Sequence, residues 1–361
     1  DDIDLATNIT PKIVCEILKK NQISFYESGI EHGTITAKVD NYKFEITTLR
    51  KDVSTDGRHA KVDFSNDWHE DASRRDFTFN AIYADLHGNL YDPFNGKKDL
   101  ELGNVKFIGD PEKRIKEDYL RILRYVRFFL NYSKVDHKNS LKKIIKQNIN
   151  GISKISSDRL LDELKKLVLS KGFLKLSKDI FSQEIITLVF PQLIHLNIFR
   201  NINDFSNKII NQKDFIFLIS LMIIDDTDNS EYFIYKYNIS NEDKKRIRFL
   251  SDYYSKRLDK NYFKEKNLWK ILYYNGKDNL IDLIDFQIFQ SKKIDKNLIK
   301  LKTFFNIQQV PKFEIKAKTL IEKFNFKEGK ELGAKLKEIE DFWVENSFKI
   351  SDQELNKIVK N

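Results

Sequence analysis

The residues best suited to chemistry are concentrated at positions 74–81, which read Arg-Arg-Asp-Phe-Thr-Phe-Asn-Ala. Two adjacent arginines, an aspartate and an asparagine surround Phe77 and Phe79, and a purely hydrophobic core does not need these charges. Guanidinium groups bind phosphate oxygens through paired hydrogen bonds, and carboxylate and amide groups can bind ribose hydroxyls. The stretch therefore predicts a binding site for a phosphorylated sugar.

A pair of carboxylates stands near the start of the sequence. Residues 2–6 alternate polar and apolar side chains, which is typical of a half-buried strand. Asp2 and Asp4 would then project from one face, about 7 Å apart, and could share a divalent metal. An isolated pair of this kind is more often a solvated strand end, so the metal site depends on further residues.

Glu45 is the candidate for a third carboxylate. Two alternating runs, residues 34–39 and 42–49, flank a turn at residues 40–41 and predict a hairpin. Residues 50–64 show little periodicity and predict a loop, and residues 105–108 predict a short last strand. In the run at residues 42–49 Glu45 points away from the apolar side chains, so it could stand beside the two aspartates. Three carboxylates that hold two metal ions would activate an attacking hydroxyl and neutralise a departing pyrophosphate, which is the chemistry of nucleotidyl transfer.

Thr10 and Pro11 predict the start of a helix that runs to about residue 20, with Ile13 and Ile17 among the side chains that face inward. Asp110 and Pro111 predict the start of a second helix that runs to about residue 130. Asp118 and Arg121 would lie one turn apart on this helix, either as a surface ion pair or as a reader of nucleotide bases. A carboxylate only accepts hydrogen bonds and a guanidinium only donates them. The pair therefore complements the amino group and bare ring nitrogen of cytosine or adenine, whereas guanine and uracil would leave buried groups unpaired.

The chain resembles the class II tRNA nucleotidyltransferases, or CCA-adding enzymes, a family that also contains the bacterial poly(A) polymerases. The resemblance covers most of the chain and depends on six pieces in family order, at residues 2–7, 45–50, 56–59, 71–81, 109–111 and 117–128. Weaker similarity continues at residues 155–167 and 329–343. It implies that CTP, CTP and then ATP are joined to the 3′ end of tRNA, with Mg²⁺ as the cofactor and no protein partner.

The resemblance also implies roles for individual residues. Asp2 and Asp4 would bind Mg²⁺ and Glu45 would assist them, which makes these three the catalytic residues. Asp56 and Arg58 would belong to a flexible loop that helps the site change from CTP to ATP, and an intact loop favours full CCA addition. Seven residues would bind the nucleotide. Arg75 and Asp76 would contact its phosphate and ribose, Asp118 and Arg121 would read its base, and Arg124 and Arg127 would hold phosphates. Asn80 belongs to the same nucleotide-binding set.

The sequence departs from the family pattern at its start. The family places a Gly-Gly-x-Val-Arg-Asp motif just before the metal-binding aspartates, and this sequence begins at Asp1, after that motif. Because every later motif is kept, we expect a natural segment to precede Asp1. We also expect residues 1–361 alone to have low activity.

Charge is distributed unevenly along the 361 residues. Residues 1–110 carry 14 basic and 20 acidic side chains, a net charge of −6, and residues 111–361 carry 49 and 34, a net charge of +15. An acidic front is suited to cations and a basic rear to a polyanion, although a lysine-rich composition alone could produce the surplus. The single cysteine excludes an internal disulfide. No apolar run is long enough for a membrane span, so we expect a cytoplasmic protein.

These patterns predict an α+β protein, in which a small mixed-sheet nucleotidyltransferase head is followed by helices only. We expect four parts: a head, a neck that recognises the base, a helical body and a tRNA-binding helical tail, at residues 1–110, 111–170, 171–270 and 271–361. Two other functions remain open. One is a poly(A) polymerase, which shares the catalytic residues, and the other is a non-catalytic relative that only binds tRNA.

Overall fold

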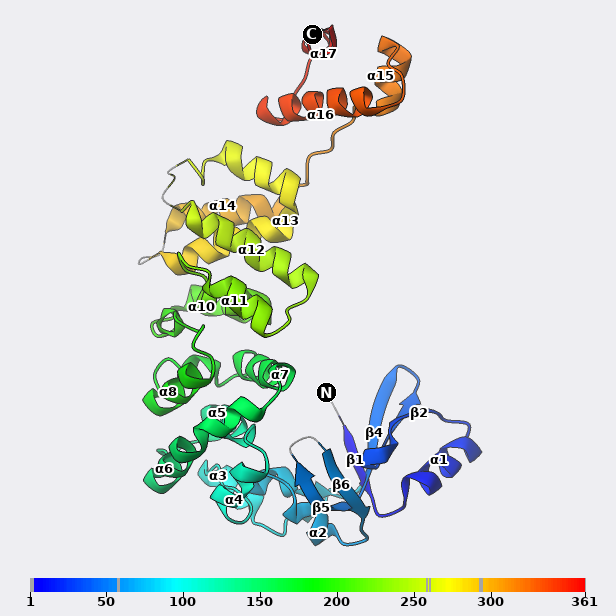
Figure 1. The fold of residues 1–361 in the computed structure, drawn as a ribbon, viewed down its shortest axis with the longest axis vertical. Coiled ribbons are helices and arrows are strands. Elements are labelled where there is room, and N and C mark those ends of the chain that lie inside the picture. Colours follow the sequence, from blue (N-terminus) through cyan, green and yellow to red (C-terminus); the bar gives the residue numbers. More distant parts are fainter. Residues whose placement is uncertain (1–2, 57–58, 258, 260, 292–294, 361) are drawn as a thin grey trace. The chain divides into compact units, whose positions relative to one another are not determined.

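The structure is a computed structural model that separates into two units, Asp1–Arg200 and Asn201–Asn361. It describes residues 3–56, 59–257, 259, 261–291 and 295–360, with the side chains of residues 28 and 52–62 left out. Of the predicted site residues, Asp2, Arg58 and the side chain of Asp56 therefore lie outside the described part. The predicted fold class is confirmed, since a small mixed sheet is followed by helices (Figure 1).

The first unit begins with a four-stranded mixed sheet in the order β1-β4-β3-β2. Its strands are β1 (Asp4–Thr7), β2 (Ser24–Gly29), β3 (Thr34–Val39) and β4 (Tyr42–Thr48). Strand β1 pairs with β4 in parallel, and the other neighbours are antiparallel. The predicted hairpin is confirmed: Asp40 adopts a φ of 53° in its turn, a left-handed conformation that Asp tolerates better than most residues.

Helix α1 (Pro11–Lys20) covers one face of this sheet, and it begins at the predicted Thr10-Pro11 start. Its buried side chains pack with those of β3 in a core formed by Val14, Cys15, Leu18, Ile35 and Ala37. The prediction that Ile13 and Ile17 face inward was wrong, because both are more than 40% exposed. The side chains of α1 that pack against the sheet are those of Val14, Cys15 and Leu18. The buried face of the helix is therefore narrower than its set of apolar residues.

The next segment was predicted to be a loop, and that prediction was wrong. Residues 50–64 form an antiparallel hairpin of β5 (Arg50–Asp56) and β6 (His59–Phe64), with Asp56 paired to His59. Many charged residues hide the alternation of these strands. The sequence signal for a hairpin here is Gly57 between the two strand segments, because glycine favours the two-residue turns that join antiparallel strands.

Residues 74–81, called the arginine stretch below, lie within a compact series of short elements. These are α2 (Trp68–Ser73), η2 (Thr78–Ala81), β7 (Tyr83–Ala84), β8 (Leu90–Tyr91) and α3 (Gly96–Leu102). Gly96 packs directly against η2, where a Cβ atom would stand 2.2 Å from the carbonyl oxygen of Thr78. The short last strand predicted at residues 105–108 is absent as a strand: Phe107 makes one isolated bridge to Phe77.

The long helix predicted from Asp110 is instead two helices. Helix α4 (Pro111–Glu117) is capped by the Asp110 side chain, as predicted, and α5 (Arg121–Tyr132) follows a break. Asp118 is extended at the break, with φ −151° and ψ 105°, and its carboxylate accepts a hydrogen bond from the Leu120 N–H at 3.1 Å. This local side-chain bond competes with helical hydrogen bonding and explains the interruption.

The remaining helices of the first unit follow α5 in the chain. They are α6 (Asn139–Asn148), η3 (Ile149–Lys154), α7 (Ser157–Val168), η4 (Phe173–Lys175), α8 (Ile180–Val189) and η5 (Leu196–Phe199). An aromatic core joins the arginine stretch to α5, since Phe77 contacts both Phe107 and Phe128 at ring distances of 4.6 and 5.3 Å. Tyr125 of α5 is 2% exposed and belongs to the same core, where its ring stacks with that of Phe107.

The second unit contains helices and their connections among its described residues. The helices are α9 (Asp204–Ile210), α10 (Phe215–Ile223), α11 (Asn229–Lys236), α12 (Asn241–Ser255), α13 (Glu265–Gln290), α14 (Lys296–Ile307), α15 (Ala317–Phe324), α16 (Lys330–Glu345) and α17 (Asp352–Lys360). The apolar run noted in the sequence is α10, which is buried along its whole length. None of the helices in the described part is long and apolar enough to cross a membrane.

A buried ion cluster holds the long helices of this unit together. Asp285 on α13 is fully buried between Lys213 and Lys302, whose Nζ atoms lie 2.8 and 2.7 Å from its oxygens. Lys213 also contacts Asp282, which in turn binds Arg246 of α12. Each carboxylate is thus balanced by a cation from another element, which a buried charge requires.

Candidate active site

Asp4 and Glu45 are direct neighbours on the open face of the sheet. They are partners in the parallel register of β1 and β4, so their side chains point to the same face. Ile46 and Leu5 are partners one position along, and Ile46 packs on the core under α1, which places the two carboxylates on the opposite face. Both acidic residues are exposed.

The two carboxylates have the right donor chemistry for a divalent ion. Neither makes a hydrogen bond or ion pair with another described residue, so their oxygens remain available as hard ligands of the kind Mg²⁺ prefers. Within residues 3–360, apart from the undescribed positions, no group of three potential ligands is gathered. Asp2, which was predicted to bind the metal together with Asp4, lies outside the described residues.

Asp71 organises the arginine pair. Its carboxylate, 1% exposed, contacts Arg74 at 2.8 Å and Arg75 at 3.1 Å, and accepts a hydrogen bond from the Tyr83 hydroxyl at 2.6 Å. Burial opposes ionisation, but the two guanidinium groups outweigh it and hold the pKa of Asp71 below its usual value. Sequence reasoning missed this residue, although its spacing of three and four from the two arginines was a usable signal.

Asp76 and Asn80 form a second polar cluster with α5. Asp76 accepts hydrogen bonds from the Asn80 amide and the Phe77 N–H, both at 2.9 Å, and its other oxygen lies 2.5 Å from Nε of Arg124. Burial raises the pKa of Asp76, but Arg124 and the hydrogen bonds lower it more, so the net pKa is below the usual value. The structure thus brings together three residues predicted to bind the nucleotide, because Asp76 is bonded to both Asn80 and Arg124.

The predicted base readers are also held by neighbours. Asp118 Oδ2 lies 2.7 Å from Arg159 Nη2 of α7, and Arg121 Nη1 donates to Glu117 Oε2 at 2.6 Å and to the Arg114 carbonyl at 2.7 Å. Asp118 and Arg121 flank the break between α4 and α5, where the Arg121 N–H donates to the Asp118 carbonyl at 3.0 Å. Their partners were not among the predicted site residues.

Arg127 is the most enclosed of the predicted phosphate ligands. Its Nε lies 2.5 Å from the buried Glu163 of α7, and its guanidinium carbon stands 4.2 Å from the ring centre of Phe128. Its side chain is 15% exposed, against 35% for Arg75 and 30% for Arg124. Arg75 and Arg124 are therefore better placed than Arg127 to reach a ligand without rearrangement.

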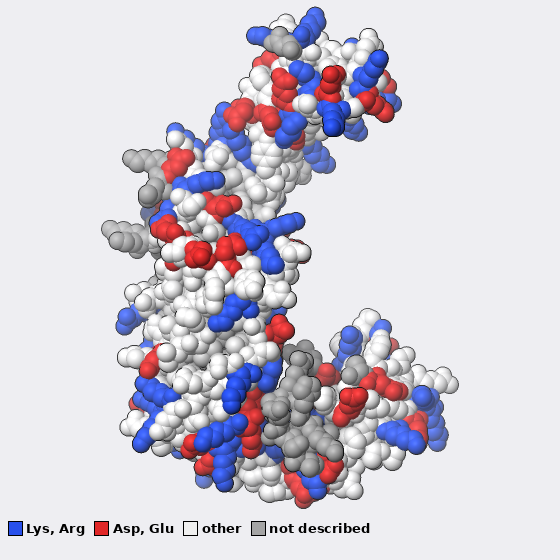
Figure 2. All heavy atoms as spheres, viewed as in Figure 1, with Lys and Arg blue, Asp and Glu red and all other residues white. Residues whose placement is uncertain are grey.

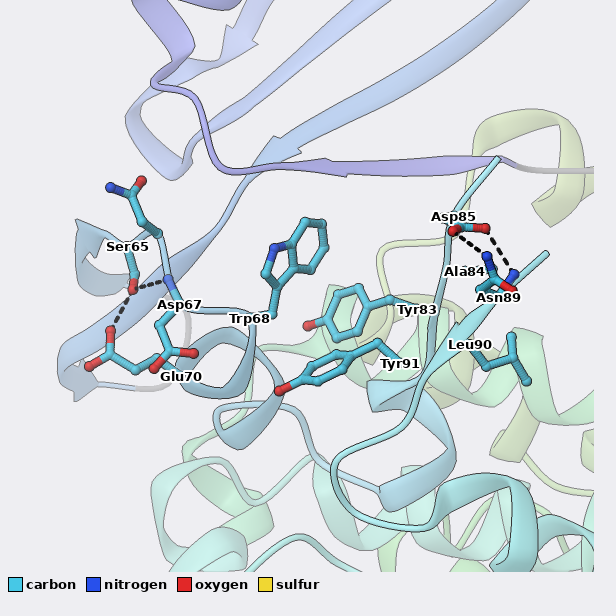
Figure 3. A pocket seen from close by; sticks show the side chains of 11 residues that line it. Ser65, Asp67, Trp68, Glu70, Tyr83, Ala84, Asp85, Asn89, Leu90 and Tyr91 are labelled. Carbon is cyan, nitrogen blue, oxygen red and sulfur yellow. Dashed lines mark hydrogen bonds between the residues drawn. The ribbon is translucent and has the colours of Figure 1, made fainter. Parts of the chain in front are cut away.

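A cavity of about 840 Å³ lies in the first unit, between the start of α2 and the hairpin of β7 and β8. Trp68, Tyr83 and Tyr91 line it (Figure 3). The carboxylates at its rim already accept hydrogen bonds from neighbouring residues. Glu70 accepts from the Ser65 hydroxyl, Asp67 from the His69 N–H and Asp85 from the Asn89 N–H. None of the predicted site residues lines this cavity, but the hydroxyl of Tyr83 connects its wall to Asp71.

Three family models match consecutive parts of the chain. Residues 1–106 match the model "Poly A polymerase head domain", residues 138–196 match "Probable RNA and SrmB- binding site of polymerase A", and residues 208–359 match tRNA nucleotidyltransferase domain 2. The matched segments together extend over the head sheet, the helices around α7 and the second unit.

Among solved structures, the chain is similar to the crystal structure of the Bacillus stearothermophilus CCA-adding enzyme in complex with CTP. The TM-score is 0.70 at 20% identity, with 96% of this chain and 85% of that chain covered. The Thermotoga maritima CCA-adding enzyme complexed with tRNA has a TM-score of 0.61 at 19% identity, with 99% and 86% covered. These likenesses establish the fold.

Three named proteins are similar in sequence to this chain over most of its length. The CCA tRNA nucleotidyltransferase 1, mitochondrial, of Homo sapiens is 33% identical over 381 residues, which cover 99% of this chain and 82% of the relative. The protein of the same name from Danio rerio is 29% identical, with 98% and 82% covered. The CCA-adding enzyme of Staphylococcus haemolyticus is 29% identical, with 87% and 74% covered. The chain therefore belongs to the family of CCA-adding tRNA nucleotidyltransferases.

Proposed function

We propose that this chain adds C, C and A in turn to the 3′ end of tRNA, with CTP and ATP as substrates and pyrophosphate as product. The observation that carries the proposal is the register of Asp4 with Glu45, which places two exposed carboxylates side by side on an open sheet face. The human relative, which matches over 99% of the chain, bears a name that describes this reaction.

We assign the Mg²⁺ site to Asp4 and Glu45, with Asp2 as the third ligand that the family resemblance implies. When bound, the metal would activate the 3′ hydroxyl of the tRNA and stabilise the charge on the departing pyrophosphate. The protein supplies the rigid base for this site, because β1 and β4 are fixed by their backbone pairing and by the core under α1.

Asp118 and Arg121 would select the base. Arg159 and the Leu120 N–H use one lone pair on each oxygen of Asp118, and each carboxylate oxygen has a second lone pair for the amino group of cytosine or adenine. Both described contacts of Arg121 use Nη1, which leaves N–H groups on Nε and Nη2 for the ring nitrogen. Arg159 would thus orient the carboxylate without blocking it.

Arg75 and Arg124 would hold the phosphates of the nucleotide. Each is tied to a buried aspartate, at Asp71 and Asp76, so its position is fixed before a ligand arrives. Each also keeps about a third of its side chain exposed. Asp76 and Asn80 would then contribute to ribose binding from the edge of their cluster. Arg127 is bonded to Glu163 through Nε, so its Nη1 and Nη2 groups would be the donors for a phosphate.

The tRNA would be bound by the basic part of the chain. Residues 111–361 carry a net charge of +15, and lysine and arginine contacts to phosphate provide sequence-independent affinity for RNA. Basic side chains are spread over the viewed faces of both units, interleaved with acidic ones (Figure 2). We therefore propose the four parts predicted from the sequence: a catalytic head, a neck that reads the base, and a helical body and tail that bind RNA.

The proposal is tested with Asp4→Ala and a tRNA that lacks its CCA end. We expect Asp4→Ala to reduce nucleotide addition by about 10³-fold, on the scale of losing one key electrostatic group, while tRNA affinity stays within about twofold. Glu16→Ala is the matched control, because this exposed carboxylate lies on α1, away from the proposed metal face. Near-normal addition by Asp4→Ala would contradict the assignment.

A second candidate is a poly(A) polymerase, because the match to residues 1–106 is described as a poly(A) polymerase head domain. The base readers suit adenine as well as cytosine. This candidate predicts long A tails made from ATP alone, without a requirement for CTP. A non-catalytic relative would instead bind tRNA tightly, add nothing, and be indifferent to Asp4→Ala.

The cytoplasmic location expected from the sequence remains a prediction. Two of the relatives are named as mitochondrial proteins, and their names describe those proteins only. Fractionation of the source cells, with the protein followed by an antibody, would test the prediction.

A further inference from the structure

Arg114 lies at the junction between α4 and the arginine stretch of the head. Its Nη2 donates to the backbone carbonyls of both Arg74 and Arg75, each at 2.5 Å, and its Nη1 donates to Glu117 at 2.5 Å. The side chain is 12% exposed, so these contacts are largely shielded from water. A planar guanidinium with several donors can make such contacts in fixed directions, which a lysine cannot.

Glu117 continues this connection to the base reader. One oxygen of Glu117, Oε2, accepts from Arg114 at 2.5 Å and from Arg121 at 2.6 Å. Arg121 also donates to the backbone carbonyl of Arg114 at 2.7 Å. The orientation of Arg121 is therefore set by Glu117 and Arg114, and these two residues are themselves fixed to the backbone at residues 74–75.

We propose that Arg114 and Glu117 are positioning residues that set base selection by fixing Arg121 relative to the phosphate-binding arginine stretch. The inference rests on the proposed function, since it assigns how the base reader is held rather than what it reads. Neither residue needs to touch the nucleotide. The phosphate and base of one nucleotide have a fixed separation, so the protein gains selectivity if its two binding groups are held at a matching separation.

The charges explain what each change would do. The carboxylate of Glu117 lies between two guanidinium groups, those of Arg114 and Arg121, that are only 12% and 13% exposed. Glu117→Gln keeps the shape and one acceptor oxygen but removes the charge that balances the two cations. Arg121 would then move away from Arg114 and approach the base from more than one direction. Its ability to exclude bases with the wrong edge should fall, because selection depends on unpaired donors and acceptors being forced together.

The test measures KM and kcat for CTP and ATP, together with misincorporation of UTP, on a tRNA that lacks its CCA end. We expect Glu117→Gln to raise the KM for CTP and ATP and to lower the preference for CTP over UTP by about tenfold, which is within the range for one lost polar contact. We expect Arg114→Lys to change the same preference in the same direction, because lysine cannot hold two carbonyls and a carboxylate in one plane.

Glu112→Gln is the matched control on the same helix. Glu112 pairs with Lys116 at 2.7 Å, and both side chains are well exposed, at 44% and 56%. We expect its KM values and its preference for CTP over UTP to match those of the unmodified chain. If Glu117→Gln fails to fold by circular dichroism, Arg114→Lys decides the question alone.

An unchanged preference for CTP over UTP in folded Glu117→Gln and Arg114→Lys would overturn the inference, even if both variants are slower. This outcome differs from failure of the proposed function. In that case the unmodified chain itself would add no nucleotide to tRNA, or would add only A.

Discussion

Replacing Asp71 by asparagine tests how much of the site is fixed by one buried carboxylate. Asp71→Asn keeps the size of the side chain but places an amide where two guanidinium groups and the Tyr83 hydroxyl donate hydrogen bonds. The carboxylate is 1% exposed, and the loss of one member of a buried ion pair costs about 3 to 5 kcal/mol. For a unit of this size, that corresponds to a fall in the melting temperature of roughly 6 to 20 °C.

Differential scanning calorimetry of the whole chain would measure this change, with Asp63→Asn as the control because Asp63 is exposed on β6. The pKa of Asp71 is lowered in the folded state, so its contribution is present above the unfolded pKa and is lost as pH falls through the folded pKa. The difference between Asp71→Asn and the unmodified chain should therefore shrink at acidic pH. A melting temperature within 1 or 2 °C of the unmodified value near neutral pH would refute this reasoning.

Two further predictions concern stability. Asp179 caps α8 and accepts from His137, and these bonds outweigh burial to lower its pKa from 3.8 to about 2. Its stabilisation should be lost as pH falls from 3.8 toward 2, and Asp179→Asn should flatten that part of a stability curve measured by urea unfolding. Asp285→Ala should cost about 3 to 5 kcal/mol in urea unfolding, because it removes the fully buried carboxylate that pairs with Lys302 and one of the two that pair with Lys213. Little change in either measurement would contradict the corresponding ion network.

The parts of the fold that the sequence predicted are those governed by local rules. The hairpin of β3 and β4 follows from alternation around residues 40–41, and the starts of α1 and α4 follow from Thr10-Pro11 and Asp110-Pro111. The pairing of β1 with β4 also agrees with the expected neighbourhood of Asp4 and Glu45. For the hairpin and the two helix starts, a short stretch of chain contains both the signal and the structure.

The parts that could not be predicted depend on contacts between distant residues. The break at Asp118 is stabilised by packing of Tyr119 onto Gly151, where a Cβ atom would stand 2.0 Å from the ring, and by the bond to Arg159. The pairing of Asp76 with Arg124 joins residues 48 positions apart. Sequence alone showed which side chains are charged, but it did not show which would bind each other and which would remain for a nucleotide.

The most direct test of the proposed function is the sequence of the product made from a tRNA without its CCA end. The tRNA is incubated with CTP alone, with ATP alone and with both, and the new 3′ ends are sequenced. We predict two C residues with CTP alone, no extended tail with ATP alone, and C-C-A followed by a stop when both are present. A long A tail from ATP alone, or no addition with both nucleotides, would contradict the function proposed here.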